Sequence, residues 1–273
     1  MGRVSAPREV RGFVPPVLAV PAILGLALLV LPLAALIGRV EWSTLWTDIT
    51  RPEAVSALVL SLATGLTATA VCIVLGVPLA LIIARSGPRW SGVLRVLVTI
   101  PLVLPPMVGG VALLILLGRS GPVGTFLDEW WGLRIPFTTA AVVIAQVFVA
   151  LPFLVLTLEG SLRTAGVDFE RTAAALGAGR WRILWRVTLP LAAPGLIAGI
   201  ILCFARAIGE FGATALFAGN APGVTQTMPL AIYTAFNGSG VEPGTAVALS
   251  LLLLVTAIAV LLFVRGWRFG TPR

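Results

Sequence analysis

The sequence predicts an all-α integral membrane protein with six transmembrane helices in a single domain, residues 1–273. Hydrophobic residues make up 58% of the chain, charged residues only 11%, and the mean hydropathy is +1.05, which is far from the values of soluble domains. Long uncharged stretches reach the roughly 20 residues that a helix needs to cross a bilayer. The arginines between these stretches gather on alternate connections. Together these observations leave no room for a sizeable soluble domain.

The apolar stretches give the expected positions of the spans. The first, preceded by Arg3, Arg8 and Arg11, is too long for a signal peptide, so we interpret it as a retained helix. A further apolar run at 228–236 is too short to cross and is expected to be a surface or re-entrant helix in an outer loop. The six spans are expected at 14–37, 54–84, 96–118, 135–158, 191–217 and 245–264.

The third span contains the sequence PLVLPPMVGG at 101–110. Its prolines, among them Pro105 and Pro106, interrupt the hydrogen-bond ladder of a helix. Hydrocarbon tolerates such an interruption only where protein or a cavity satisfies the freed backbone groups. We therefore expect this span to face protein rather than lipid. Pro105 and Pro106 are candidates for a translocation path or gate.

The arginines predict the orientation. Fourteen of them fall in the two terminal tails and in the second and fourth connections, whereas the opposite side has only Arg39, Arg51, Arg119 and Arg134, accompanied by six acidic residues. By the positive-inside rule, both termini and the 159–190 connection are cytoplasmic. This topology accounts for the net charge of +8, so nucleic acid is not an expected partner.

Residue types that the chain lacks exclude several kinds of chemistry. The chain has no lysine and no histidine, because all 19 basic residues are arginine. A GxxxxGK[ST] nucleotide site, a HExxH zinc site and a histidine-assisted nucleophile are therefore impossible here. Cys72 and Cys203 are isolated within apolar runs and indicate neither a disulfide framework nor a metal site. We expect a protein that is not an enzyme and binds no cofactor of its own.

The fourth connection, 159–190, has the pattern of a structured element. The run 169–176 favours a short helix, with Asp168 as its N-cap and Gly177 as its C-terminal stop. Arg180, Trp181 and Arg182 follow, as in an element lying at the membrane surface, and Pro190 marks the entry to the fifth span. On physical grounds alone, an ordinary interfacial helix explains this pattern equally well.

The same residues resemble the EAA loop of permease subunits in binding-protein-dependent ABC importers. Glu170, Ala173, Ala174 and Gly177, followed at the family's spacing by Val187, Leu189 and Pro190, carry the resemblance. One departure concerns the glutamate, because the strict register places it at 171, where this chain has Arg171. A salt bridge made by the family's glutamate therefore does not transfer to Glu170 on sequence alone.

Further blocks narrow the resemblance to the molybdate permeases and their sulfate and tungstate relatives. These blocks are PLVLPPMVGG, LGAGRWR at 176–182, FARAIGEFGAT at 204–214 and GNAPGVTQTMPLAIYTA at 219–235. The resemblance covers most of 56–261 and implies a type I importer permease in a bacterial-type cell membrane. It also implies the partners: a second permease copy, two ATP-binding subunits that hold ATP-Mg, and an extracytoplasmic oxyanion-binding protein. The resemblance favours molybdate as the anion, with tungstate and sulfate or thiosulfate as the alternatives.

The fifth span contains Arg206 and Glu210, which are four residues apart and so lie on one helix face. Charges within a membrane are costly and usually face a bundle interior or a cavity. In one interpretation, this pair lines the path and Arg206 transiently contacts the anion. In the other, the two charges only neutralise each other and fix helix packing.

The outer loop offers four candidates for contact with the binding protein. These polar residues, which turn chemistry alone would also explain, are Asn220, Thr225, Gln226 and Thr227. An alternative from another class is an ion-coupled secondary transporter, which also has broken helices and buried charges. Such a transporter has no reason to possess an EAA loop, which, as the resemblance implies, couples a permease to its ATP-binding subunits.

Overall fold

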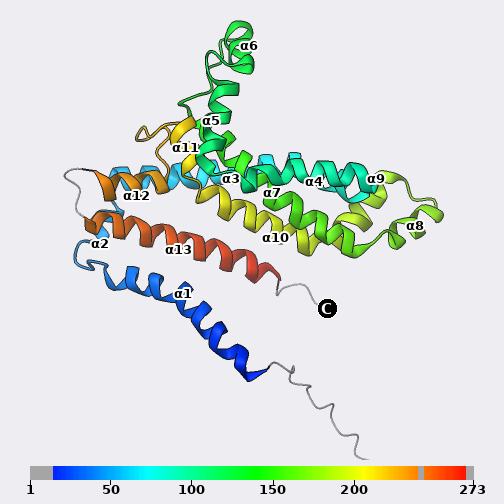
Figure 1. Ribbon diagram of the computed structural model, residues 1–273, viewed down its shortest axis with the longest axis horizontal. Coiled ribbons are helices and arrows are strands. Elements are labelled where there is room, and N and C mark those ends of the chain that lie inside the picture. Colours follow the sequence, from blue (N-terminus) through cyan, green and yellow to red (C-terminus); the bar gives the residue numbers. More distant parts are fainter. Residues whose placement is uncertain (1–14, 239–242, 269–273) are drawn as a thin grey trace, which may run out of the picture.

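The computed structural model describes residues 15–238 and 243–268. Figure 1 shows an elongated bundle in which α3 (Pro52–Arg85), α7 (Thr139–Ala165), α10 (Leu189–Ile208) and α13 (Pro243–Arg268) run along the long axis. At the centre, α7 packs against both α3 and α10. Buried small residues on these three helices, among them Ala68, Ala150 and Ala207, let the backbones approach closely.

Four helices are long and apolar enough to span a membrane: α1 (Ala19–Gly38), α3, α7 and the continuous stretch Arg180–Ile208. The bent pair α4 (Pro88–Val103) and α5 (Pro106–Leu117) counts as a fifth if it forms one span. Within α13, the described apolar segment covers Gly244–Val260. The total of six spans and the cytoplasmic termini stay predictions.

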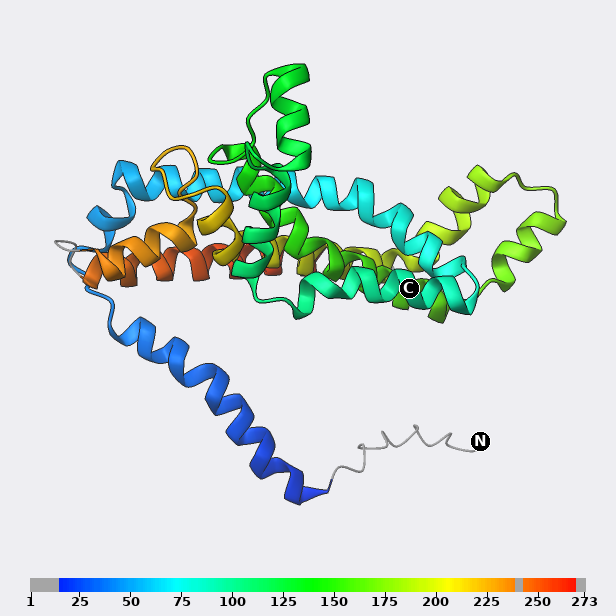
Figure 2. The same ribbon diagram turned by 45° about the horizontal axis from the view of Figure 1, so that its top comes forward.

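The first predicted span appears as a short 3-10 turn, η1 (Pro16–Leu18), followed by α1. No residue of α1 is buried, and its apolar side chains are exposed on all sides. Figure 2 shows α1 diverging from the bundle. The short helix α2 (Leu45–Ile49) then leads into α3, and the Asp48 side chain in α2 accepts a hydrogen bond of 3.2 Å from Thr245 in α13.

The third predicted span, 96–118, is not one helix. It consists of parts of α4 and α5, and the chain direction bends by 109° between these two helices. Leu104 is extended (φ −67°, ψ 136°), and Pro105 and Pro106 contribute no N–H groups to a ladder. The predicted interruption is confirmed, but it redirects the chain. In Figure 1, α5 and α6 (Pro122–Trp131) project from the bundle as an arm.

The fifth predicted span, 191–217, extends beyond the C-terminal end of the helix that the structure shows. α10 ends at Ile208, residues 209–211 are not helical, and α11 (Gly212–Phe217) is a separate helix. At the other end the helix begins earlier, because α9 (Arg180–Ile183) and a π-helical turn, η2 (Leu184–Thr188), lead directly into α10. Pro190 lies in the first turn of α10, as predicted, but the helical path continues upstream of it to Arg180.

The remaining predictions need smaller corrections. The fourth span, predicted at 135–158, is α7, which starts at Thr139 and continues to Ala165, so residues 159–165 belong to this helix rather than to the loop. The short helix predicted at 228–236 is confirmed as α12 (Met228–Asn237). The backbone N–H of Met228 donates to Ser61 Oγ in α3 at 2.7 Å, which fixes α12 to the bundle.

The two helix breaks lie against each other. A Cβ added at Gly110 in α5 would lie 2.8 Å from the Ala213 carbonyl oxygen in α11, and one at Gly212 would lie 3.2 Å from Pro106. The α10–α11 break therefore packs against the start of α5. Phe217 and Ala213 of α11 also pack against Ala145 and Val149 of α7 in one buried cluster.

Candidate coupling and translocation sites

The helix α8 (Asp168–Ala175) extends from one end of the bundle, and none of its residues is buried (Figures 1 and 2). It ends as predicted at Gly177, which has a φ of +82°. The N–H groups of Gly177 and Ala178 donate to the carbonyls of Ala174 and Ala173 at 3.0 Å each. This Schellman arrangement closes the helix and needs a glycine at the left-handed position.

The predicted role of Asp168 as N-cap is wrong. Val167 is the N-cap, and Asp168 is the first residue inside the helix, where its side chain makes no capping hydrogen bond. Its carboxylate lies 3.8 Å from Arg171 on the surface. A negative charge in the first turn still complements the helix dipole, so Asp168 supports the helix from a different position.

Glu170 is the residue of α8 that binds the bundle. Its Oε1 accepts hydrogen bonds from Arg85 Nη2 of α3 at 2.7 Å and from Thr188 Oγ1 of η2 at 2.9 Å. Arg85 also donates to the carbonyls of Leu162 and Gly166, at 3.3 and 3.1 Å. We call Arg85, Glu170 and Thr188 the latch. The salt bridge that the sequence left open therefore exists for Glu170, and it is made within the chain.

The sequence did not predict a role for Thr188, because the family motif specifies residues 187, 189 and 190 and allows any residue at position 188. The N–H of Leu189 donates to the Leu184 carbonyl, five residues back, which is a π-helical bond. Pro190 follows directly, and proline has no N–H and crowds the carbonyl four residues earlier. The wider turn accommodates Pro190, and Thr188 lies at its end within reach of Glu170.

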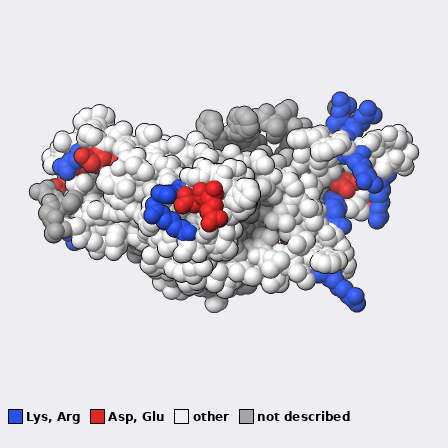
Figure 3. All heavy atoms as spheres, turned by 90° about the horizontal axis from the view of Figure 1, so that it is seen from above, with Lys and Arg blue, Asp and Glu red and all other residues white. Residues whose placement is uncertain are grey.

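The part of α8 and α9 that faces outward is basic and apolar. Arg171, at the strict register position, has 77% of its side chain exposed, and Phe169, Leu176 and Trp181 are also exposed. Arg180, Arg182 and Ala174 are exposed as well, whereas Ala173 is half-buried. Figure 3 shows basic side chains gathered over this end of the molecule.

A second ionic cluster, absent from the sequence predictions, fixes the same end of the bundle. Glu159 of α7 is only 3% exposed, and Oε1 lies 2.5 Å from Arg95 Nη2 of α4 and 2.6 Å from Arg163 Nε. A buried carboxylate needs such partners, because an unpaired buried charge is very costly. The cluster joins α4 to α7.

At the other site, Arg206 and Glu210 pair as the sequence predicts. Arg206 Nη2 lies 2.5 Å from Glu210 Oε2, as an ionic contact rather than an aligned hydrogen bond, and Glu210 is 1% exposed. The other oxygen, Oε1, accepts from the Ala213 N–H at 2.7 Å. Because α10 ends at Ile208, Glu210 lies in the helix break and binds the start of α11.

Pro105 and Pro106 belong to the same region. Pro106 begins α5 and lies against Gly212, two residues after Glu210, while Pro105 is the exposed N-cap of α5. The structure therefore brings together the predicted path residues from two separate spans. Their role in translocation stays a prediction.

The outer-loop candidates are mostly interior. Thr225 and Thr227 are fully buried and Gln226 is 9% exposed, so in this conformation a soluble protein does not reach them. Thr225 Oγ1 accepts from the Ala221 N–H at 2.9 Å and so closes a turn. Only Asn220 is exposed; its Nδ2 donates to Thr234 Oγ1 at 2.8 Å.

Gln146 is a further polar residue that the sequence analysis overlooked. It is fully buried on α7, and within the described residues neither of its side-chain polar atoms has a hydrogen-bond partner; the hydroxyls of Thr214 and Thr227 share this property. Gln146 follows Ala145, which packs with α11, and precedes Ala150, which packs with α10. It is therefore level with the α10–α11 break.

Comparisons with known proteins agree with this architecture. The solved structures that resemble it include a bacterial ABC transporter for the import of alginate (TM-score 0.70, 16% identity, 94% of this chain and 95% of that chain) and the MetNI methionine ABC transporter in an inward-facing form (TM-score 0.63, 18% identity, 80% and 96%). At these identities the likeness shows the fold: that of a type I ABC importer permease.

Curated relatives are closer in sequence. The molybdenum transport system permease protein ModB of Mycobacterium tuberculosis is 52% identical over 242 residues, which cover 89% of this chain and 90% of the relative. The protein of the same name from Escherichia coli K12 is 37% identical over 212 residues, 77% of this chain and 91% of the relative. The family model for binding-protein-dependent transport system inner membrane components matches residues 76–266. The chain therefore belongs to this family of multi-pass membrane permeases.

Proposed function

We propose that the chain is the permease of an ATP-driven importer for a tetrahedral oxyanion, and that the anion is molybdate. The names of the relatives support the anion, and the latch is the observation that supports ATP-driven transport. A short helix that is exposed along its length, yet fixed to the bundle through Glu170, is suited to receive force from a separate subunit. A secondary transporter has no use for such an element.

The proposed assembly contains a second copy of this chain, two ATP-binding subunits and an extracytoplasmic oxyanion-binding protein. ATP and Mg²⁺ bind the ATP-binding subunits, because this chain has no lysine for a phosphate-binding loop. The exposed apolar side chains Phe169, Leu176 and Trp181 are the surface that these subunits contact. Asn220 is the remaining candidate for contact with the binding protein.

The contacts suggest how force reaches the path. A displacement of α8 acts on α3 through Arg85 and on η2 through Thr188. Because η2 is continuous with α10, the movement reaches the break at Glu210. There, the Arg206 side chain is 26% exposed, and its guanidinium has donors for a passing dianion. The contact is transient, since tight binding would prevent release.

Reconstitution into vesicles with the cognate ATPase and binding protein tests the function. ATP-dependent uptake is measured for molybdate, tungstate and sulfate at equal concentrations. We expect molybdate to be taken up fastest. Uptake that follows an ion gradient without the ATPase contradicts the importer, whereas faster uptake of sulfate contradicts the choice of anion only.

A further inference from the structure

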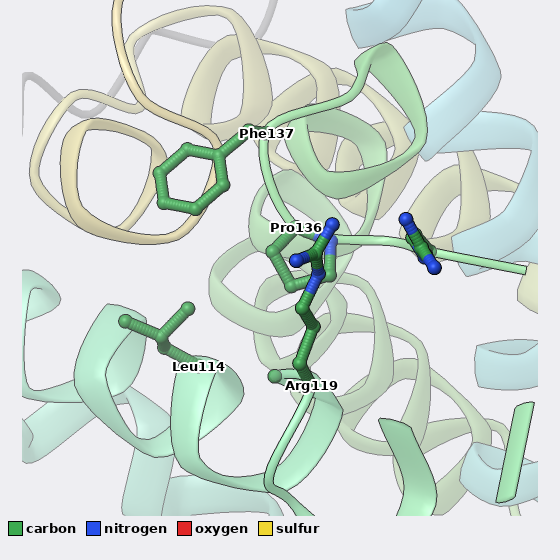
Figure 4. A pocket seen from close by; sticks show the side chains of 6 residues that line it. Leu114, Arg119, Pro136 and Phe137 are labelled. Carbon is green, nitrogen blue, oxygen red and sulfur yellow. The ribbon is translucent and has the colours of Figure 1, made fainter. Parts of the chain in front are cut away.

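A cavity of about 490 Å³ lies where the α5–α6 arm joins the bundle. Its volume falls in the range of small-molecule sites, about 300–1,000 Å³. Figure 4 shows it from close by, with the Arg119 side chain extending from the end of α5 toward Pro136. The residues that line it are Leu114, Gly118, Arg119, Arg134, Pro136 and Phe137.

Two guanidinium groups border this cavity, and both have N–H groups that are not used in hydrogen bonds. Within the described part of the chain, the Arg119 guanidinium has no hydrogen-bond or ionic partner. Arg134 donates through Nε to both oxygens of Asp128, at 3.1 and 3.2 Å, and this contact leaves its two Nη groups unused. Paired N–H groups of arginine match the oxygens of a tetrahedral anion in geometry and charge.

The backbone at Phe137 supports a functional interpretation. Phe137 has a φ of +64°, which is costly for a bulky residue and is held by the surrounding structure. Its N–H donates to the Phe217 carbonyl of α11 at 3.3 Å, and its ring occupies the space beside Gly219, where a Cβ would lie 3.1 Å away. The cavity wall is thereby joined to α11, which begins beside Glu210.

We propose that this cavity, through Arg119 and Arg134, is a receiving site for the tetrahedral oxyanion on its way to the helix break. The proposal rests on the proposed function and on the predicted topology, which places both arginines outside. Asp128 and Glu129 of α6 lie on the same arm, where basic and acidic groups appear side by side (Figure 3). These carboxylates keep the site weak, as a step in transport requires.

The test compares Arg119→Gln, Arg134→Gln and the double variant in the complete reconstituted importer. Arg39→Gln is the matched control, because Arg39 is exposed, predicted to lie on the same side and outside the cavity. We expect about a fivefold to tenfold loss of initial molybdate uptake for each single variant and a larger loss for the double variant, with no change for Arg39→Gln. ATP hydrolysis stimulated by the loaded binding protein should stay within twofold.

Two further measurements separate an anion site from a structural or docking role. Arg119→Lys keeps the charge and should recover at least half of the uptake; a loss equal to that of Arg119→Gln overturns the proposal. Affinity for the loaded binding protein should not change, and a loss of affinity equal to the loss of uptake shows a docking surface instead. If wild-type importer transports molybdate and all arginine variants match it, the receiving site is refuted while the proposed function stands. If the wild type itself shows no ATP-dependent uptake, it is the proposed function that fails.

Discussion

The α8 end of the molecule and the region of the two helix breaks satisfy their polar groups very differently. At the α8 end, Glu170 and Glu159 each have two side-chain partners from other turns or helices. At the breaks, Glu210 is paired, but Gln146 and Thr214 are buried with unused polar atoms among the described residues. Phe137, whose N–H binds the end of α11, also has a strained backbone.

This difference fits the two tasks of a coupled transporter. An element that transmits force must move as one body with its neighbours, and multiple charged hydrogen bonds provide that rigidity. A path must change shape, and unpaired buried groups raise the free energy of one arrangement so that another becomes accessible. The predictions below test this contrast in order of decreasing effect.

Gly177→Pro should have the largest effect. Proline fixes φ near −65°, whereas Gly177 has +82°, and proline also removes the N–H that binds the Ala174 carbonyl. We expect at least a tenfold loss of ATP-dependent uptake with normal membrane insertion. Gly179→Ala is the control, since Gly179 has a φ of −69° and open space around it. Normal uptake by Gly177→Pro would show that α8 does not couple.

Arg206→Ala leaves Glu210 buried without its cation, at a cost of about 3–5 kcal/mol. Thermal stability and uptake should both fall, and uptake should fall further than association with the ATPase. The double variant Arg206→Met, Glu210→Gln removes both charges and should recover stability. If it also recovers uptake, or if Arg206→Ala transports normally, the pair serves packing only.

The latch predicts a smaller, measurable coupling. In a double-mutant cycle, Arg85→Ala and Glu170→Ala should show an interaction free energy of about 1 kcal/mol, because both side chains are partly exposed. Each single variant should lower the number of anions imported per ATP hydrolysed. Arg89→Ala is the control, since Arg89 is exposed and, among the described residues, has no ionic partner. Strict additivity would mean that the latch does not act as a unit.

Gln146→Leu should have the smallest effect on uptake, and its effect on stability should have the opposite sign. Replacing a buried amide that has no partner by an apolar side chain of similar size removes a desolvation cost, so unfolding should require about 1–3 kcal/mol more. Uptake should fall, because the break region becomes too stable in one state. Ser61→Ala, which removes the acceptor of the Met228 N–H, should instead destabilise the protein. Lower stability of Gln146→Leu would mean that the amide has a partner.

Much of the fold could be predicted because its signals are local. The apolar length of α3, the glycine stop at Gly177 and the i, i+4 pair Arg206–Glu210 each depend on residues close together in sequence. Pro105 and Pro106 predicted an interruption, since proline lacks an N–H whatever surrounds it. The 109° bend between α4 and α5 could not be predicted, because it depends on α11 packing against α5.

The sequence by itself determined that this is a membrane permease with a short helix at the EAA motif, because hydropathy, charge asymmetry and motif spacing depend only on the order of residues along the chain. Only the tertiary structure decided which partner Glu170 has, since Arg85 and Thr188 are 85 and 18 residues away. It also decided that Thr225 and Thr227 are buried and that Arg119 and Arg134 share a cavity. Burial and long-range pairing arise when helices pack, and the linear pattern of residues does not contain them.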